Sequence, residues 1–561
     1  MNELEELFPI DIRTPSHVLA RRAALHPDAS FVGFIDRERR SIKSYTYNEF
    51  NDRVNSVANG LIAGGIQPGE KVMVMLPNSF EFVECFFALS RIGAVQVPTN
   101  FLYMAPQLQH VLSEAEPDAL IVHESFVDRF AGLDQPSLRS RYIVGCPAED
   151  PESYARLQST RPSPVADLGT FNSTLSIMFT SGTTGRSKGV VVPHHQFVWG
   201  GFNWARIGGY TESDVNYMCT PMFHVAFYTF LGSSLVTGGS IVFTDWFSAT
   251  HFWEEVRLAG ATAFGYQGSI MQMLWKQPPL PHDRDNPVRV AIGAAAPPNI
   301  IRDFEQRFDL EIVEGFGMTE NTIVTATLPG EERRLGSAGH ALPGWQINVV
   351  NDNDEPVPPG EVGELVVRPL EPYVLATGYY RQPEATVQAW RNLWFHTGDA
   401  GALDADGYFY YSHRIKDAIR RRGENISALE VELAISEHPA VLECAVIAVP
   451  SELAEDDVKA VVVLRPNETV DPLDLLCFCE DRLPYYALPR YVEFRSALPK
   501  TPSQRVEKFR LREEHVSSNC WDSSAAGFVP KGHPSRQRAS HTVQQAGGTR
   551  SAGHFEGGEQ S

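Results

Sequence analysis

Strand-like and helix-like segments alternate along most of this chain, and this alternation is the feature that most limits its fold. Residues 71–76 are typical of a buried strand. Residues 79–91 are typical of a helix whose apolar face carries Phe82 and Phe86, and residues 93–98 return as a strand. The alternation predicts an α/β fold with mostly parallel sheets.

The chain of 561 residues is too long for a single hydrophobic core, and a second α/β block begins near Ser412. Ser427 lies three residues before Glu430, a capping-box pattern that predicts a helix to about Glu437. Two apolar strands and another helix follow, which is enough for a small domain of about 100 residues. Few large apolar residues remain in 515–561, so this segment is predicted to be a disordered tail.

Composition excludes several classes of partner. The net charge of -21 argues against nucleic acid and anionic membranes, which both need a basic face. No apolar run is long enough for a transmembrane segment, and the acidic N-terminus lacks the pattern of a signal peptide. We therefore expect a cytoplasmic protein. Its seven cysteines are scattered without metal-ligand spacing, which indicates reduced thiols.

The strongest chemical signal is a run of hydroxyls, glycines and a lysine that follows an apolar strand. Glycines let backbone N–H groups approach phosphate oxygens, hydroxyls add donors, and the lysine supplies positive charge. Lys188 is followed by Gly189 instead of Ser or Thr, so the run is not a Walker A loop. The candidate phosphate-binding residues are Thr180, Ser181, Gly182, Thr183, Thr184, Gly185 and Lys188.

Residues 180–189 resemble the phosphate-binding signature of the adenylate-forming superfamily, which contains acyl-CoA synthetases, luciferases and the adenylation domains of peptide synthetases. The resemblance extends from about residue 16 to residue 514, with further motifs in the expected order. It implies a large N-terminal domain of several subdomains (1–412), a hinge (413–416), a small mobile α/β domain (417–514) and the tail. It also implies ATP, Mg²⁺ and coenzyme A as ligands.

The resemblance also assigns roles to the N-terminal motifs. Glu314, Gly315, Phe316 and Gly317 match the segment that packs on the adenine. Thr319 would donate to the α-phosphate, and Glu320 would hold Mg²⁺ together with Thr180, since hard cations prefer oxygen ligands. Asp399 matches the ribose-binding aspartate, because a carboxylate can accept both ribose hydroxyls. Glu364 matches a further motif, which we interpret as structural.

The motifs near the domain junction carry one departure from the family. Arg414 would contact ribose or phosphate, Lys416 occupies the hinge position, and Gly423 would leave room for the pantetheine arm. The last motif usually contains Gly-Lys, whereas this chain has Gln504 and Arg505. The family lysine contacts the acyl carboxylate and the α-phosphate. Arg505 keeps the charge but is bulkier and planar, so the exchange is not neutral.

The segment 221–224 resembles the substrate-pocket motif of acyl-CoA synthetases, in which His224 would be an aromatic gate. No aspartate stands beside it, which argues against an α-amino acid substrate. The pocket candidates are mostly apolar, which favours an acid with an apolar or weakly polar body. They are His224, Val225, Phe227, Gly265, Gly268, Met271, Gly293, Ala294, Met318 and Ile323. Several segments resemble the crotonobetaine/carnitine–CoA ligase branch.

These features predict an ATP-dependent acyl-CoA ligase of the AMP-forming type. The acid would become an acyl-adenylate, with Lys188, Glu320-bound Mg²⁺ and Arg505 stabilising the developing charge, and then a CoA thioester. Two alternatives stay open from the sequence. The acceptor could be a carrier protein instead of CoA, or Gln504 and Arg505 could mark a relative that binds nucleotide without turnover.

Overall fold

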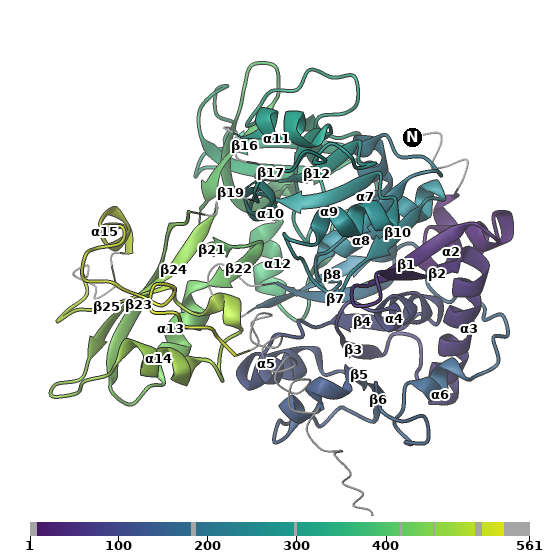
Figure 1. Cartoon of the computed structure of the whole chain (residues 1–561), viewed down its shortest axis with the longest axis horizontal. Helices are drawn as coiled ribbons and strands as arrows, with labels where there is room; N and C mark the ends of the chain where they lie inside the picture. Colours follow the sequence, from purple (N-terminus) through teal and green to yellow (C-terminus); the bar gives the residue numbers. More distant parts are fainter. Residues whose placement is uncertain are drawn as a thin grey trace, which may run out of the picture. The chain divides into compact units, whose positions relative to one another are not determined.

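The structure is a computed structural model with two compact units. The larger unit contains residues 1–427 and 450–456, and the smaller contains 428–449 and 457–561 (Figure 1). Each unit is described by itself below. The described residues are 8–180, 187–275, 277–294, 296, 300–415, 418–452, 455–499, 506 and 508–531.

A nine-stranded sheet forms one half of the larger unit. Its strands run parallel from β13 to β1, and the strands at both edges are antiparallel. In spatial order they are β15 (His340–Ala341), β14 (Thr325–Ala326), β13 (Glu311–Phe316), β12 (Val290–Ala294), β11 (Ala263–Gln267), β9 (Val215–Met218), β10 (Ser240–Phe243), β1 (Ser30–Asp36) and β2 (Ser41–Thr46).

A seven-stranded sheet forms the other half. It is parallel from β7 to β6, while β8 and β18 extend it as antiparallel strands. In spatial order its strands are β18 (Gly378–Tyr379), β8 (Lys188–Pro193), β7 (Thr174–Thr180), β4 (Val95–Pro98), β3 (Lys71–Met75), β5 (Ala119–His123) and β6 (Ser140–Val144). The predicted α/β class with mostly parallel sheets is confirmed.

Five helices pack into one apolar core with the inner faces of both sheets. They are α2 (Pro15–Leu25), α3 (Tyr47–Ala63), α4 (Phe80–Arg91), α7 (His194–Gly208) and α8 (Val225–Thr237). Figure 1 shows α8 between the β10 side of one sheet and the β7–β8 side of the other. Ser79 caps α4 by accepting a hydrogen bond from the Phe82 N–H, so this helix begins where the sequence predicts it.

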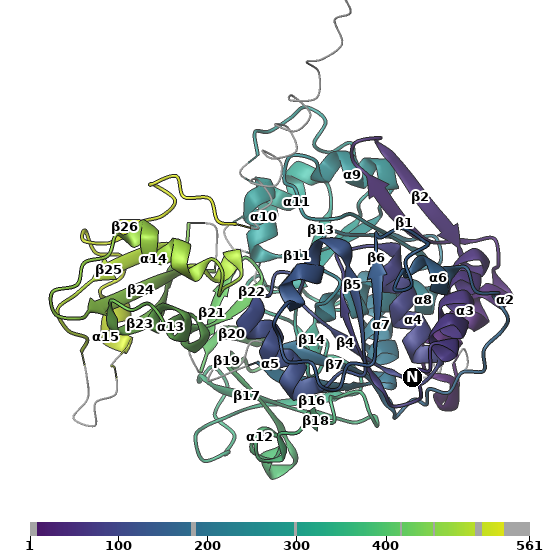
Figure 2. The same cartoon turned by 90° about the horizontal axis from the view of Figure 1, so that it is seen from below.

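Shorter helices cover the outer faces. The outer face of the nine-stranded sheet carries a second apolar core under α9 (Phe252–Ala259), α10 (Gly268–Trp275) and α11 (Ile301–Phe308) (Figure 2). The outer face of the seven-stranded sheet packs against α5 (Ala105–Ala115) and η2 (Glu124–Phe130). Two short elements, η1 (Ile10–Ile12) and α6 (Ala155–Gln158), complete this part of the unit.

Helices α7 and α8 cross with their backbones in contact. A Cβ atom built on Gly201 of α7 would overlap the backbone of Gly232 in α8, and one built on Gly232 would lie 2.9 Å from the Gly201 Cα. A larger residue at either position would therefore force the helices apart. The crossing places the N-terminus of α8 and the side chains of α7 beside the nine-stranded sheet.

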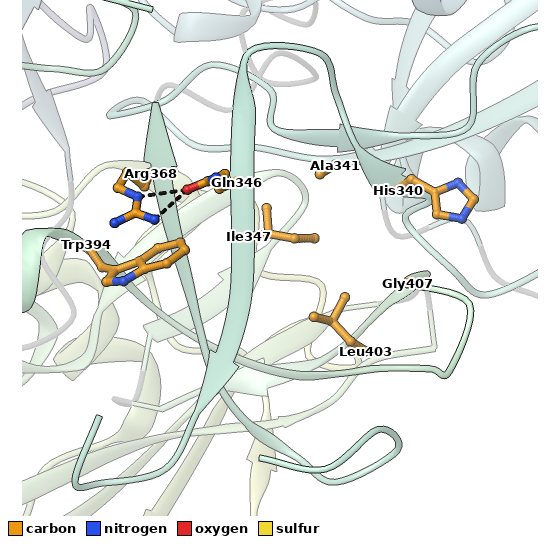
Figure 3. Close-up of a pocket in the computed structure, with 8 residues that line it drawn as sticks. All are labelled: His340, Ala341, Gln346, Ile347, Arg368, Trp394, Leu403 and Gly407. Carbon is orange, nitrogen blue, oxygen red and sulfur yellow. Dashed lines mark hydrogen bonds between the residues drawn. The ribbon is translucent and has the colours of Figure 1, made fainter. Parts of the chain in front are cut away.

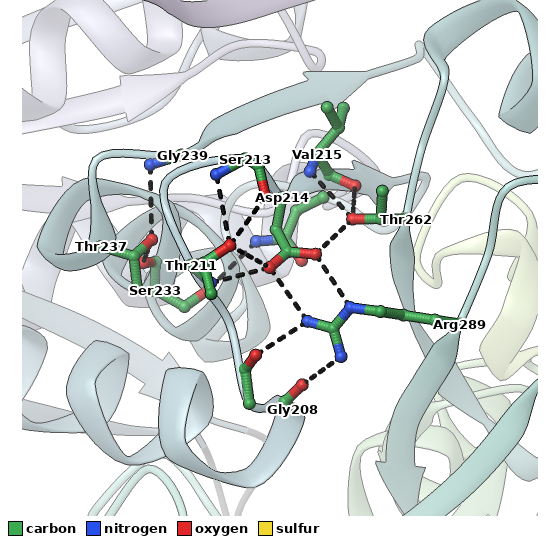
Figure 4. Close-up of polar contacts among 12 residues, drawn as sticks. Gly208, Thr211, Ser213, Asp214, Val215, Ser233, Thr237, Gly239, Thr262 and Arg289 are labelled. Atoms are coloured by element: carbon green, nitrogen blue, oxygen red, sulfur yellow. Dashed lines mark hydrogen bonds and ion pairs between the residues drawn. The ribbon is translucent and has the colours of Figure 1, made fainter.

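Polar residues lock the amino ends of the parallel strands together (Figure 4). Arg289, which precedes β12, donates to Asp214 Oδ1 at 3.0 Å and to the Gly208 carbonyl at 2.6 Å. Thr262, which precedes β11, donates to the same Asp214 oxygen at 2.7 Å. Burial would raise the pKa of Asp214, but these hydrogen bonds outweigh it and hold the pKa below its usual value. The opposite, carboxyl edge is left for ligands.

The rest of the larger unit is antiparallel. A four-stranded sheet contains β16 (Trp345–Val350), β17 (Gly363–Pro369), β19 (Phe395–Leu403) and β20 (Phe409–Arg414), accompanied by α12 (Pro383–Ala389) and η3 (Arg391–Leu393). The hairpin of β21 (Ala418–Arg421) and β22 (Glu424–Ser427) turns at Arg422 and Gly423. Both turn residues have positive φ, 53° and 81°, as a tight two-residue hairpin requires.

The smaller unit is a four-stranded sheet with three α-helices and one short 3₁₀ turn. Its elements are α13 (Ala428–Ser436), β23 (Val441–Pro450), β24 (Asp456–Leu464), α14 (Pro472–Cys479), η4 (Tyr485–Ala487), β25 (Tyr491–Phe494), α15 (Lys508–Glu513) and β26 (Trp521–Asp522). The helix predicted from the capping-box pattern is present as α13. Among the described residues, no helix combines the length and apolar character needed to cross a bilayer.

Two boundaries differ from the sequence prediction. The compact units divide at Ser427, after the β21–β22 hairpin, whereas the sequence predicts the boundary at 413–416. The sequence predicts a tail from residue 515, but Val492 of β25 pairs with Trp521 of β26, and the described chain continues to 531. A few polar residues around one tryptophan thus suffice to extend a sheet edge. Residues 532–561 lie outside the described residues.

Candidate active site

The predicted phosphate-binding run connects β7 to β8 at one end of the seven-stranded sheet. Thr180 pairs with Lys188 in the antiparallel register of these strands, so the run closes a hairpin. The residues between them fall outside the described part of the chain, and their contacts stay a prediction. They are Ser181, Gly182, Thr183, Thr184 and Gly185.

Lys188 and Glu320 come together through Tyr379. The Lys188 Nζ lies 4.6 Å from the ring centre of Tyr379, a cation–π contact. The Tyr379 hydroxyl donates to Glu320 Oε1 at 2.9 Å, and Glu320 is 5% exposed. Tyr379 reaches this place because β18 pairs with β8, where Tyr379 is opposite Val190. The Lys188 ammonium group and the Glu320 carboxylate therefore both contact the Tyr379 side chain.

Helix α7 fixes the segment that carries Thr319 and Glu320. The Gln196 amide donates to the carbonyls of Thr319 at 2.9 Å and Glu320 at 3.1 Å. The turn is closed by the Asn321 side chain, which accepts the Met318 N–H at 2.9 Å. Gly317 is required here, since any Cβ would overlap the Thr322 carbonyl. These hydrogen bonds fix the backbone of residues 318–320 and thereby the position from which the Glu320 side chain extends.

The rest of the predicted adenine segment lies on β13. Phe316 stacks on Tyr411, with ring centres 6.3 Å apart and planes at 24°, so this segment presents an aromatic surface. Gly315 lies close to the Thr325 carbonyl and Ile323, which leaves no room for a side chain. Glu314 Oε1 accepts the Ala296 N–H at 3.0 Å. Burial raises the pKa of Glu314 to about 7, because the charged form is poorly solvated there.

Asp399 lies inside β19, where residues 397–399 depart from the regular pairing with β17 and form the Asp399 turn. Its side chain is almost fully enclosed, with 1% of the residue exposed, and its backbone is paired with Arg414 of β20. The Arg414 side chain is outside the description. The preceding Gly398 has φ of 71° and donates its N–H to Glu364 Oε1 at 3.0 Å. The predicted ribose motif and the Glu364 motif are therefore in direct contact.

His224 ends the loop before α8 and contacts the β21–β22 hairpin. Its Nε2 lies 3.1 Å from Glu424 Oε1, and its ring centre is 4.5 Å from that of Phe223. Burial favours neutral His224, but the attraction of Glu424 outweighs it and raises the pKa of His224. Gly423 donates its N–H to Glu455 at 2.9 Å, which anchors the hairpin turn. The acyl-pocket histidine and the predicted pantetheine loop are thus neighbours.

The pocket candidates do not form one group. Val225 is partly buried beside His224, and Met318 is partly buried after β13. Gly293 and Ala294 end β12, where a Cβ on Gly293 would overlap the Tyr266 carbonyl. Phe227 packs in the main core, 5.5 Å from Phe82 between ring centres, which is a core position.

Other pocket candidates also separate from this group. Met271 belongs to the core on the opposite face of the sheet. The aromatic ring of Phe230 lies where a Gly265 side chain would be. The surroundings of Gly268 are outside the description.

Two predicted residues of the mobile-domain motifs fall outside the described chain. They are Lys416 and Arg505, whose roles stay predictions. Lys508, three residues after Arg505, forms an ion pair with Glu432 at 2.7 Å within the smaller unit.

The structure adds two residues that the sequence analysis missed. Tyr379 and Gln196 support Lys188 and Glu320, as described above. The signal for Gln196 is a polar side chain near the start of a helix that is buried along almost its whole length. The signal for Tyr379 is a pair of tyrosines after Gly378, a pattern that does not reveal which residue it contacts.

The donor set at Glu320 fits Mg²⁺. Within the described ranges, no cluster of three or more His, Cys, Asp or Glu residues could hold a metal by itself. Magnesium in nucleotide sites commonly takes one or two protein oxygens and completes its octahedron with phosphate oxygens and water. The buried Glu320 carboxylate and the Thr180 hydroxyl are suitable oxygens at the phosphate-binding hairpin.

A separate surface cavity of about 580 Å³ lies on the four-stranded sheet (Figure 3). Arg368 donates to Gln346 Oε1 at 2.9 Å and stacks on Trp394. The lining residues are His340, Ala341, Gln346, Ile347, Arg368, Trp394, Leu403 and Gly407. They include no residue of the Lys188–Glu320 group, so we assign the chemistry to that group and not to this cavity.

Comparison with known proteins agrees with this arrangement. The family described as AMP-binding enzyme matches residues 19–380, and its C-terminal domain matches residues 430–505. The chain belongs to the AMP-binding enzyme family. A crotonobetaine/carnitine–CoA ligase of Salmonella agona is 30% identical over 483 residues, which cover 84% of this chain and 93% of the relative.

Solved structures support the same placement. The Mycobacterium tuberculosis fatty acyl CoA synthetase is 30% identical, with a TM-score of 0.65 and coverage of 90% of this chain and 98% of that one. An amide bond synthetase from Marinactinospora thermotolerans shares the fold at 24% identity, with a TM-score of 0.79 and coverage of 88% and 99%. The predicted family, fold and ligase class are confirmed: this AMP-binding enzyme is an adenylate-forming acyl-CoA ligase.

Replacing Tyr379 with Phe should lower kcat for adenylation by about tenfold, because one hydrogen bond to the Glu320 carboxylate is lost while the ring under Lys188 remains. Pyrophosphate release measures this. Tyr380→Phe, which alters the next tyrosine, is the matched control and should keep wild-type kcat. An unchanged kcat in Tyr379→Phe would show that the contact with Glu320 does not matter for this step.

Replacing Glu314 with Gln should change the pH dependence of stability. Because the pKa of Glu314 is raised to about 7, the folded wild type binds more protons than the unfolded chain above the ordinary pKa of a glutamate. Its stability therefore falls as pH rises through this window, whereas glutamine does not titrate. The stability advantage of the variant should grow by roughly 2–3 kcal/mol between about pH 5 and pH 8.

Thermal unfolding of both proteins across this pH range measures the difference. Glu311→Gln, an exposed glutamate on the same strand, should follow the wild type at every pH. Parallel curves for Glu314→Gln and wild type would show that Glu314 does not titrate in this range.

Proposed function

We propose that this enzyme converts a compact carboxylic acid, ATP and coenzyme A into an acyl-CoA thioester, AMP and pyrophosphate. The observation that carries the proposal is the grouping of Lys188, Tyr379 and Glu320 at the end of the β7–β8 hairpin. This grouping brings a cation and a metal-binding carboxylate to a predicted phosphate loop. The enclosed Asp399 supplies the acceptor for ribose hydroxyls.

In the first step the substrate carboxylate attacks the α-phosphorus, an acyl–phosphate bond forms, and the bond to pyrophosphate breaks. Lys188 and the backbone N–H groups of the hairpin loop neutralise charge on the leaving phosphates. Arg505 neutralises the carboxylate and the α-phosphate, and Thr319 donates to the latter. Mg²⁺ held by Glu320 and Thr180 supplies Lewis-acid stabilisation when it is bound. Phe316 stacks against the adenine.

In the second step the CoA thiolate attacks the acyl carbonyl, a thioester bond forms, and AMP leaves with the electron pair of the broken bond. Gly423 gives the pantetheine arm room beside His224. Arg414 contacts the ribose or the phosphate, and Lys416 is the hinge about which the smaller domain turns between the steps. The cytoplasmic location expected from the sequence stays a prediction.

The packing beneath the acyl site supports a compact acid. Gly265, Ile292 and Val313 are register partners on the face of the nine-stranded sheet that α7 and α8 cover. Gly265 is the smallest of the three, and the space above it is filled by Phe230 of α8. Phe230 also packs edge-on against Trp204 of α7, with 5.1 Å between ring centres.

Phe230 therefore lies one step below the carboxyl ends of β11 to β13, where ligands bind in parallel sheets. On the same face, the next level toward those ends carries Gln267, Ala294 and Gly315, of which Ala294 and Gly315 are small. A pocket that opens at these small residues would end at the Phe230 ring. This closed floor suits an acid with a short body, and the Salmonella relative is named for crotonobetaine and carnitine.

The function is tested by AMP release from purified enzyme with Mg-ATP, a panel of short, medium, aromatic and betaine-type acids, and CoA. AMP that requires both an acid and CoA would support the proposal and identify the acid. AMP released with acid and a carrier protein, but not with free CoA, would replace it by the carrier-loading alternative. Nucleotide binding without AMP in wild type and in Arg505→Lys would overturn it.

Replacing Phe230 with Ala should move acid selectivity toward longer chains. The ratio of kcat/KM for a medium-chain acid over a short-chain acid should rise at least about tenfold, because each methylene admitted to an apolar pocket contributes on this scale. Phe227→Leu, which changes the neighbouring core position, is the matched control. An increase in Phe227→Leu and none in Phe230→Ala would return the pocket role to Phe227, as the sequence predicted.

A further inference from the structure

Glu364, the second residue of β17, has a largely buried carboxylate that is close to three hydrogen-bond donors. Its Oε1 accepts the Gly398 N–H at 3.0 Å. Its Oε2 lies 2.8 Å from His396 Nδ1 and 3.1 Å from Arg391 Nη2. Asp354 shares Arg391 with it at 3.1 Å and lies 3.8 Å from the other nitrogen of His396. Two carboxylates thus enclose one histidine and one arginine.

This cluster holds the turn that ends at Asp399. Gly398 takes a left-handed φ of 71°, which glycine adopts without strain, and the Glu364 carboxylate accepts its N–H. Thr397 provides the second anchor, since its hydroxyl donates to the Leu365 carbonyl at 2.7 Å and accepts the Asp399 N–H at 3.1 Å. Glu364 and Leu365 are adjacent in β17, so one strand fixes both sides of the turn.

The strand pairing is irregular at the same place. The register of β17 with β19 shifts between Glu364 and Val366, and that of β19 with β20 shifts between Ala400 and Gly401. The ladder with β17 therefore does not fix residues 397–399, although Asp399 pairs with Arg414 of β20, and side-chain anchors hold the side that faces β17. Burial would raise the pKa of Glu364, but His396, the Gly398 N–H and Arg391 lower it, so the anchor remains charged.

We propose that Glu364 is a positioning residue for nucleotide recognition, which holds the Gly398 peptide so that the Asp399 carboxylate meets both ribose hydroxyls. The inference rests on the proposed role of Asp399 in binding ribose. The family motif that contains Glu364 thereby acquires a function toward ATP that its place in a strand would not indicate. Its side chain acts through the turn and does not touch the nucleotide.

The test compares ATP with dideoxy-ATP, which lacks both ribose hydroxyls, in steady-state kinetics of wild type and Glu364→Gln. Glutamine removes the negative charge that His396 and Arg391 stabilise, which weakens the hydrogen bond to the Gly398 N–H. We expect KM for ATP to rise about tenfold with less than about a twofold change in kcat and no change in KM for the acid. KM for dideoxy-ATP should change little, so the preference for ATP should fall. Glu361→Gln, an exposed glutamate before β17, should behave as wild type.

Two outcomes would overturn the inference: an unchanged preference for ATP in Glu364→Gln, or an equal rise in KM for both nucleotides. Asp399→Asn separates this from failure of the proposed function. If wild type and Asp399→Asn show the same preference, Asp399 does not bind ribose. If Glu364→Gln does not fold by circular dichroism, Thr397→Val takes its place, because it removes the other anchor of the turn. An unchanged preference in that variant overturns the inference equally.

Discussion

The crossing of α7 and α8 is the constraint on which the arrangement of the site depends. Gly201 and Gly232 let the two backbones touch, so neither helix can slide or rotate without a clash. This contact sets where α7 presents Gln196 to the segment containing Glu320, and where α8 begins after His224. One pair of helices thereby fixes the positions of Glu320 and His224, the residues predicted to bind Mg²⁺ and to border the acyl pocket.

The remaining groups reach the site from strands and from the turn after β13 instead of helices. Lys188 and Tyr379 come from the antiparallel edge of the seven-stranded sheet, whereas Glu320 follows β13 of the nine-stranded sheet. Asp399 comes from the third, four-stranded sheet. Strand ends and irregular strand positions can present polar groups without disrupting a whole ladder, and each sheet contributes one such group. Anchors such as Glu364 fix the irregular position beside Asp399.

Sequence patterns identified the reacting groups better than their supports. Lys188, Glu320 and Asp399 lie in local motifs whose residue types suit phosphate, metal and ribose, so the sequence predicts these roles, and the structure brings Lys188 and Glu320 together at Tyr379. Tyr379 and Gln196 act across long distances in the chain, and their patterns resemble ordinary packing positions. Phe227 shows a limit of local patterns: it is one helical turn after His224, yet its side chain packs in the core, where it meets Phe82.

The sequence by itself determined the α/β class, most of the predicted helices and strands, and the motifs that name the family, because periodicity, capping residues and glycine–hydroxyl runs are local properties of the chain. The tertiary structure alone decided that Glu364 anchors the Asp399 turn and that Phe230 fills the space over Gly265. It also decided that a short strand at Trp521 extends the sheet of the smaller unit. Each of these depends on a contact between distant residues, and such contacts are set by packing and register, which local patterns do not contain.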